Sequence, residues 1–166
     1  MFERATSSVV EPSMRKRFLS SLLALSVLVS INAVRAADEG LAWQTNYKAA
    51  LKEAATSHKP ILADFTGSDW CGWCIKLASD TFSKPEFAKF AKEKLVLLEV
   101  DFPQGKEQSA AVKKQNEELQ QKFGVEGYPT LVLIDKNGKE IARNVGYLPG
   151  GPEGMITWIN ASLAKH

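Results

Sequence analysis

The 166-residue chain has little of the chemistry from which proteins build metal sites or disulfide frameworks. It contains two cysteines, two histidines and three methionines. A structural zinc site usually takes four cysteine or histidine ligands, and besides the cysteines only His58 and His166 are present. Two cysteines also cannot staple a disulfide-rich small protein. The chain must therefore fold around an apolar core, and we expect it to hold no metal.

A strong charge of either sign is also lacking once the N-terminus is set aside. The full chain has 21 Lys and Arg residues against 19 Asp and Glu. Residues 1–36 hold five of the bases and two of the acids, which leaves 16 bases against 17 acids in residues 37–166. This balance predicts neither nucleic-acid binding nor attraction to an anionic membrane.

The sequence lacks an apolar run long enough to span a membrane, although it contains an apolar stretch near its N-terminus. A basic segment, Met14-Arg15-Lys16-Arg17, is followed by an apolar run with serines over 18–29 and by small residues up to Ala36. This order predicts a signal peptide over residues 1–36, cleaved after Ala36 or one residue later, with Met14 as a possible start. The alternative is an uncleaved membrane anchor, but the run is shorter than the about 20 apolar residues that a span requires. We therefore expect a periplasmic or secreted protein with one domain over 37–166.

Apolar spacing and turn residues predict helices and strands in alternation, followed by a hairpin. Helices are predicted over 41–57, 71–81, 85–93 and 107–122, and a last one carries Ile156, Ile159 and Leu163. Strands are predicted over 61–65, 95–102, 130–134 and 140–145, the last two joined by an Asn-Gly turn. This order predicts an α/β domain with a mixed central sheet flanked by helices on both faces. Functional residues of such sheets lie beyond the carboxyl ends of strands, which points to the loop 66–70.

Both cysteines lie in the segment Trp70-Cys71-Gly72-Trp73-Cys74, shortly after the strand over 61–65. A disulfide across so few residues constrains little of the unfolded chain and therefore adds little stability. At the start of a helix, free backbone N–H groups stabilise a thiolate, so Cys71 is the expected nucleophile. Cys74, one turn further along, is the expected resolving thiol. The alternatives are half of a zinc site and an inert structural bridge.

Four segments fall in the order and spacing of the thioredoxin family. They are ILADF (61–65), WCGWC (70–74), FGVEGYPT (123–130) and KNGK (136–139). Over about residues 43–163 the chain resembles this family, and the segment TGSDWCGWC resembles exported bacterial thioredoxin-like proteins in particular. Two features depart from thioredoxin. One additional residue separates Asp64 from Cys71, and Trp73 stands where thioredoxin has proline.

The resemblance implies roles for further residues. Pro129 would form a cis peptide bond facing the cysteines, and Tyr128 would offer its backbone to an extended substrate. Asp64 would be a buried acid with a raised pKa that accepts a proton from Cys74. The alternatives are a trans proline that opens a strand, an aspartate bonded to a turn at a strand end, and tryptophans that merely pack. The expected substrate-binding residues are Trp70, Gly72, Trp73, Tyr128 and Thr130.

These roles imply a thiol–disulfide oxidoreductase that needs no cofactor, because electrons pass through the Cys71–Cys74 couple. The expected partners are disulfide-containing proteins and a membrane-embedded thiol donor, and we expect a monomer. Gly72 and Trp73 place no charge beside the sulfur, and Asp69 opposes ionisation of Cys71, so a reductant or isomerase is favoured over a strong oxidant. The rival hypotheses are a peptide-binding module without redox activity and a Cu(I) carrier that uses both thiols.

Overall fold

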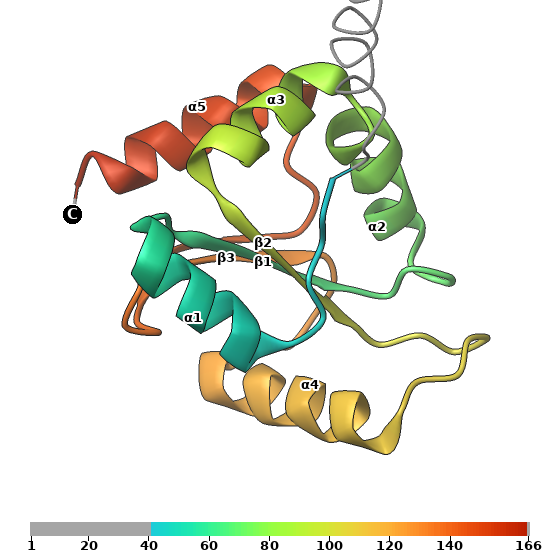
Figure 1. Cartoon of the computed structure of the whole chain (residues 1–166). Helices are drawn as coiled ribbons and strands as arrows, with labels where there is room; N and C mark the ends of the chain where they lie inside the picture. The colour runs from blue at the N-terminus through green and yellow to red at the C-terminus, as the bar shows by residue number, and fades with distance from the viewer. Residues whose placement is uncertain (1–40, 166) are drawn as a thin grey trace, which may run out of the picture. The chain divides into compact units, whose positions relative to one another are not determined.

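A four-stranded mixed sheet with helices on both faces makes up residues 41–165, the residues that this computed structural model describes (Figure 1). The signal peptide expected over residues 1–36 lies outside the described residues. The elements in chain order are α1 (Tyr47–Ser57), β1 (Ile61–Thr66), α2 (Gly72–Leu77), the π-helical turn η1 (Ala78–Phe82), α3 (Pro85–Lys94), β2 (Val96–Asp101), α4 (Ala110–Phe123), β3 (Thr130–Ile134), β4 (Glu140–Val145) and α5 (Gly151–Leu163). The predicted α/β class with a mixed sheet is confirmed.

The strands lie in the order β2-β1-β3-β4. β1 runs parallel to β2 and antiparallel to β3, and β3 and β4 form the antiparallel hairpin. Because β1 is paired on both sides and covered on both faces, all six of its residues are buried. β1 ends at Thr66, and the loop that leads to the cysteines follows it.

Successive residues of β1 point into two separate apolar cores. Ile61, Ala63 and Phe65 pack with residues of α1 and α4, whereas Leu62 packs with residues of α2, α3 and α5. Figure 1 shows the same division, with α1 and α4 on one side of the sheet and α2, α3 and α5 on the other. The alternation places Asp64 on the side of α2, because a strand residue faces the same way as its second neighbour.

The first helix is shorter than the sequence predicts. It begins at Tyr47 rather than near residue 41, because Asn46 caps it by accepting a hydrogen bond from the amide of Ala49 at 2.9 Å. Trp43, which shares helical spacing with Tyr47, lies before the helix and packs against Phe82 in the opposite core, with ring centroids 5.0 Å apart. Gln44 instead pairs with the outer edge of β2.

A polar cap and a glycine set the boundaries of α4, and a glycine shapes the turn between β3 and β4. α4 starts at Ala110 rather than at residue 107, because Ser109 accepts a hydrogen bond from the amide of Val112. Gly124 ends it in the left-handed conformation (φ 58°). The predicted turn between β3 and β4 is confirmed, and its Gly138 (φ 82°) is so close to the Tyr47 hydroxyl that a Cβ would lie 2.9 Å from it.

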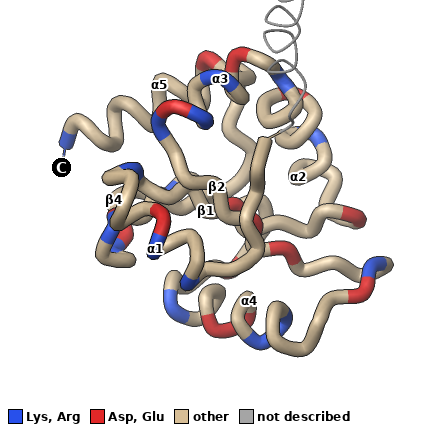
Figure 2. The backbone as a smooth tube through the Cα atoms, viewed as in Figure 1, with Lys and Arg blue, Asp and Glu red and all other residues tan. Residues whose placement is uncertain are grey.

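Charges of both signs are spread along the helices rather than gathered on one of them (Figure 2). This distribution agrees with the small net charge of the sequence. Among the helices of residues 41–165, none combines the length and apolar character needed to cross a membrane.

Candidate active site

The loop after β1 is held tightly before it reaches the cysteines. The carbonyl of Gly67 accepts hydrogen bonds from the amides of Trp70 (3.2 Å) and Cys71 (2.9 Å). The indole of Trp70 folds back over Gly67, so that a Cβ there would lie 2.5 Å from the ring. The indole Nε1 donates to the carbonyl of Phe102 at 2.7 Å. The loop therefore fixes both Trp70 and the start of α2.

Cys71 and Cys74 form a disulfide across the first turn of α2, with Cα atoms 5.2 Å apart. Cys71 is the N-cap residue, and its Sγ accepts a hydrogen bond from the amide of Cys74 at 3.2 Å. Cys71 is 8% exposed and Cys74 is 4% exposed. A sulfur that receives a helix amide is suited to carry a negative charge once the bond opens. Within residues 41–165 no three metal-binding side chains cluster.

The two tryptophans that border the cysteines in sequence belong to two aromatic groups. Trp70 meets Tyr128 edge to face, with centroids 5.9 Å apart, and Tyr128 stacks on Phe102 at 5.1 Å. Trp73 packs against Tyr147 at 5.4 Å. Trp70 is 43% exposed and Trp73 is 60% exposed. Both tryptophans thus present apolar surface to solvent beside the cysteines.

A polar network behind Trp73 joins α2 and η1 to the loop before α5. The hydroxyl of Tyr147 donates to Asp80 at 2.9 Å, and Lys76 both pairs with Asp80 and lies 5.5 Å from the centre of the Tyr147 ring. The hydrogen bond from Lys76, followed by that from Tyr147, lowers the pKa of Asp80. Sequence reasoning missed Tyr147. The spacing of Lys76 and Asp80 by one helical turn was a signal for part of this network.

The peptide bond between Tyr128 and Pro129 is cis, the geometry that the family resemblance implied. The carbonyl of Pro129 accepts a hydrogen bond from the amide of Gly146, which ties this segment to the end of β4. Thr130 is buried, and its hydroxyl donates to the carbonyl of Gly127 at 2.8 Å. Its side chain is therefore not available to a substrate, and any contact by Thr130 is confined to its backbone. Gly72, by contrast, is exposed, with open space where a Cβ would stand.

Asp64 lies within β1 between Glu99 of β2 and Leu131 of β3, and not at a strand end as in the alternative interpretation. It is 7% exposed, and its Oδ1 has no hydrogen-bond partner in the described part of the chain. Burial, and after it the negative charges of Glu99 and Asp101, raise its pKa to about 8. Asp64 is therefore a carboxyl group that holds its proton near neutral pH, on the sheet face that α2 covers.

Asp69 is held by hydrogen bonds to the loop after β2. Its carboxylate accepts hydrogen bonds from the amides of Gln104 (3.0 Å) and Gly105 (2.6 Å), and that of Gln104 contributes most to lowering its pKa. These two hydrogen bonds connect the Asp69 side chain to the loop after β2 and hold that loop in place. The lowered pKa keeps this carboxylate ionised, so the negative charge that the sequence places two residues before Cys71 remains.

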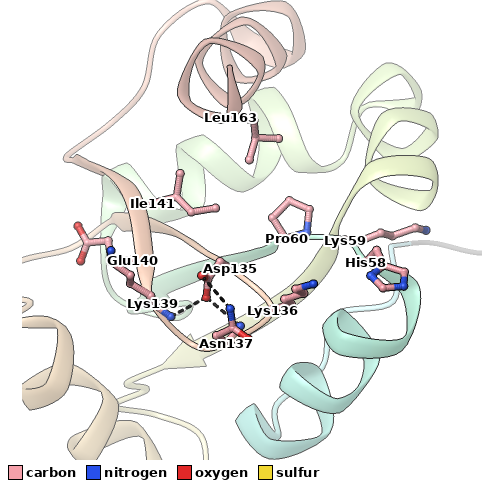
Figure 3. A pocket seen from close by; sticks show the side chains of 10 residues that line it. All are labelled: His58, Lys59, Pro60, Asp135, Lys136, Asn137, Lys139, Glu140, Ile141 and Leu163. Carbon is pink, nitrogen blue, oxygen red and sulfur yellow. Dashed lines mark hydrogen bonds between the residues drawn. The ribbon is translucent and has the colours of Figure 1, made fainter. Parts of the chain in front are cut away.

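A pocket of about 420 Å³ lies at the opposite end of the sheet (Figure 3). It is lined by His58, Lys59 and Pro60 before β1 and by residues of the β3–β4 hairpin. Asp135 closes the hairpin by accepting hydrogen bonds from the amides of Asn137 and Lys139. Because β1 begins at this pocket and ends at the cysteine loop, the pocket takes no part in the chemistry of the cysteines.

Comparison with protein families identifies residues 47–161 as a Thioredoxin-like domain. The chain belongs to this family. Disulfide bond reductase DsbH of Chlamydia pneumoniae is 42% identical over 123 residues, which cover 74% of this thioredoxin-like chain and 73% of DsbH. Thioredoxin-related protein DsbJ of the same organism is 30% identical over 128 residues, covering 76% of this chain and 37% of DsbJ. A solved structure described as DsbH oxidoreductase superposes with a TM-score of 0.72 at 40% identity, covering 78% of this chain and 89% of that one.

This thioredoxin-like chain is a thiol–disulfide oxidoreductase. Family membership supplies the fold, and the disulfide at the start of α2 supplies the two sulfurs that such chemistry requires. The residues that sequence reasoning missed around the site are Phe102, Tyr147, Asp80 and Glu99. For Glu99 a signal existed, because it follows Leu97 at strand spacing and so lies on the same face of β2.

Proposed function

We propose that this thioredoxin-like protein is exported and reduces or isomerises disulfides in other proteins. The observation that carries the proposal is the position of Cys71 at the start of α2, where its sulfur accepts a hydrogen bond from the amide of Cys74. When the disulfide is reduced, the same amide would stabilise the Cys71 thiolate, which is the attacking species in thiol–disulfide exchange.

The proposed reaction proceeds through a mixed disulfide. The Cys71 thiolate attacks one sulfur of the substrate disulfide, and the other substrate sulfur leaves as a thiolate that takes a proton from water. Cys74 then gives its proton to the Asp64 carboxylate and attacks Cys71, which expels the second substrate thiol. Two electrons pass to the substrate, and the protein ends with the Cys71–Cys74 disulfide.

The surface proposed to receive the substrate is formed by the exposed tryptophans and the segment with the cis peptide bond. Trp70 and Trp73, which border the two cysteines in sequence, offer exposed apolar surface, and Tyr128 lies against Trp70. The backbone around Tyr128 is proposed to pair with an extended segment of the substrate. Gly72, which has no side chain, leaves room for that segment to approach the sulfurs.

Two arguments support reduction or isomerisation over strong oxidation. Gly72 and Trp73 carry no charge that would hold the Cys71 thiolate more strongly than the helix amides do. A relative that is 42% identical bears the name of a disulfide bond reductase. We therefore expect a reduction potential nearer to the about −270 mV of thioredoxin than to the about −120 mV of a strong oxidant. A redox titration against glutathione measures it, and a value at the oxidising end of this range would reverse the proposed direction.

Export rests on the N-terminal pattern of basic, apolar and small residues. In an oxidising compartment the protein would need a donor to return it to the dithiol, for which we propose a membrane-embedded thiol protein. N-terminal sequencing of the protein from its native cell tests export, with Ala37 or the following residue expected as the new terminus. An intact N-terminus in a membrane fraction would indicate an anchor instead.

Substitution of Cys71 separates exchange chemistry from peptide binding. Cys71→Ser is expected to abolish reduction of insulin disulfides, because serine cannot form the mixed disulfide. Cys74→Ala is expected to accumulate mixed disulfides with native substrates, which identifies them after trapping in the cell. Full activity of Cys71→Ser in preventing aggregation of unfolded proteins, without any exchange activity in the wild type, would favour the binding module.

A further inference from the structure

Asp64 has one polar neighbour across the sheet. In the register of the strands it lies between Glu99 of β2 and Leu131 of β3. Leu131 is fully buried, whereas Glu99 is partly exposed. Because β2 is the outer strand and β1 is a central one, Glu99 lies between the buried carboxyl group and the edge of the sheet.

The two carboxyl groups lie on the same face. Leu62 and Leu97, which precede Asp64 and Glu99 by two residues, pack in the core beneath α2, so both acids point to that side. Oδ1 of Asp64 is buried without a hydrogen-bond partner in residues 41–165. An unpaired buried oxygen of this kind leaves Asp64 free to receive a proton from a group on α2.

Few charged groups act on Asp64. From β2 these are Glu99 and Asp101, and the effect of Glu99 is the larger. The Asp101 carboxylate is already engaged by the amide and the hydroxyl of Ser68, at 2.9 and 2.6 Å. α2 contributes the thiols of Cys71 and Cys74 when the disulfide is open, and Lys106 acts on Glu99 rather than on Asp64.

We propose that Glu99 is a positioning residue of the exchange reaction, whose charge on the neighbouring strand controls the pH at which Asp64 takes up the proton of Cys74. The inference rests on the role proposed above for Asp64. Two adjacent carboxylates in a poorly solvated place resist simultaneous ionisation. An ionised Glu99 therefore strengthens the hold of Asp64 on a proton, and the proton leaves for water when Asp64 ionises again.

The direct test is a carbon NMR titration of the Asp64 carboxyl group in the oxidised protein, in which the cysteines do not titrate. We expect the midpoint of the wild type to lie near the pKa of about 8. In Glu99→Gln the midpoint is expected to fall, with a roughly three-fold or greater loss of proton affinity at Asp64. Glu93→Gln, which removes an exposed glutamate of α3, is the matched control and should leave the midpoint unchanged.

A second variant guards against a failure of Glu99→Gln to fold. Glu99→Lys replaces the negative charge with a positive one, so the midpoint should fall further than in Glu99→Gln. A titration midpoint that falls in the order wild type, Glu99→Gln, Glu99→Lys cannot be explained by a loss of packing alone. An unchanged midpoint in either folded variant would overturn the inference.

Kinetics separate this inference from the proposed function. The rate of disulfide reduction by the reduced wild type should rise with pH as Asp64 ionises, and in Glu99→Gln this rise should occur at lower pH. A pH profile that does not move with the NMR midpoint would overturn the inference by removing Asp64 from the reaction. Loss of activity in Cys71→Ser would still uphold the proposed exchange function in that case.

Discussion

At the scale of single residues, the proton on Asp64 couples the folding of the protein to pH. The ordinary pKa of an aspartate is 3.8, and burial raises that of Asp64 to about 8. Between these values the folded state keeps a proton that the unfolded chain releases. The folded state binds more protons there, so the contribution of Asp64 to stability falls as pH rises from about 4 to 8.

Replacement of Asp64 by asparagine removes this dependence. We expect Asp64→Asn and the wild type to be closest in stability near pH 4, with the variant gaining on the wild type as pH rises, by an amount on the order of a few kcal/mol above pH 8. Urea unfolding of both oxidised proteins across this range measures the difference in free energy of unfolding. A difference that does not change with pH would mean that Asp64 ionises freely in the folded state.

Gly67 is a second residue whose identity the structure requires. A Cβ at this position would lie 2.5 Å from the Trp70 ring, which is packed in the loop by its hydrogen bond to Phe102. We expect Gly67→Ala to displace Trp70, to cost about 1–3 kcal/mol of stability and to reduce activity toward protein disulfides. Tryptophan fluorescence, urea unfolding and insulin reduction report the three effects.

Gly72→Ala is the matched control, because nothing lies within 4 Å of the Cβ that it adds. Its stability should stay within about 0.5 kcal/mol of the wild type. Equal losses in both variants would show that the backbone freedom of glycine, and not the contact with Trp70, is what matters at Gly67.

At the scale of elements, the network behind Trp73 links the helix that carries the cysteines to the loop before α5. Tyr147 contacts Trp73 through its ring and Asp80 through its hydroxyl. We expect Tyr147→Ala to raise the KM for a protein substrate several-fold, because Trp73 loses the ring that supports it. Reduction of a small disulfide such as oxidised glutathione should change little, because it needs less of this surface.

Tyr147→Phe serves as the control for that variant, since it keeps the ring and loses only the hydrogen bond to Asp80. Its KM for the protein substrate should stay near that of the wild type. If both substrates slow down equally in Tyr147→Ala, the network supports the cysteines themselves and not the substrate surface.

The elements also show where sequence reasoning is sufficient. β3, β4 and the turn between them match their predicted bounds, because the short apolar run of β3 and the Asn-Gly pair after it are local signals. The sequence predicts a first helix from residue 41 because Trp43 shares helical spacing with Tyr47, although the two residues face opposite cores. Helical spacing alone cannot detect the cap at Asn46 that separates them.

In the candidate site, two kinds of residue are predictable: those of one short segment, and Asp64, Tyr128 and Pro129, which the family resemblance supplies. The cysteines and the flanking tryptophans belong to one short segment. Tyr147 and Glu99 act through contacts with residues far away in sequence, which depend on strand register and loop packing. The hydrogen bonds of Asp69 to the loop after β2 likewise join residues far apart in the sequence.

At the scale of the whole molecule, we expect the fold not to depend on the disulfide. Two apolar cores, one on each face of the sheet, hold the described residues together. The loop closed by Cys71 and Cys74 is very short, so its closure removes little entropy from the unfolded chain. Any difference in stability between the oxidised and reduced proteins therefore reports mainly how the folded site favours one redox state.

This linkage gives an independent test of the proposed direction of electron flow. Strong oxidants of this kind are oxidising because their reduced form is stabilised. For a reductant we expect the oxidised protein to be at least as stable as the reduced protein, as measured by urea unfolding with and without an excess of dithiothreitol. Cys71→Ser, unfolded under both conditions, controls for effects of the reagent. A reduced form that is clearly the more stable would mean that the folded site favours the dithiol, and the protein would then act as an oxidant.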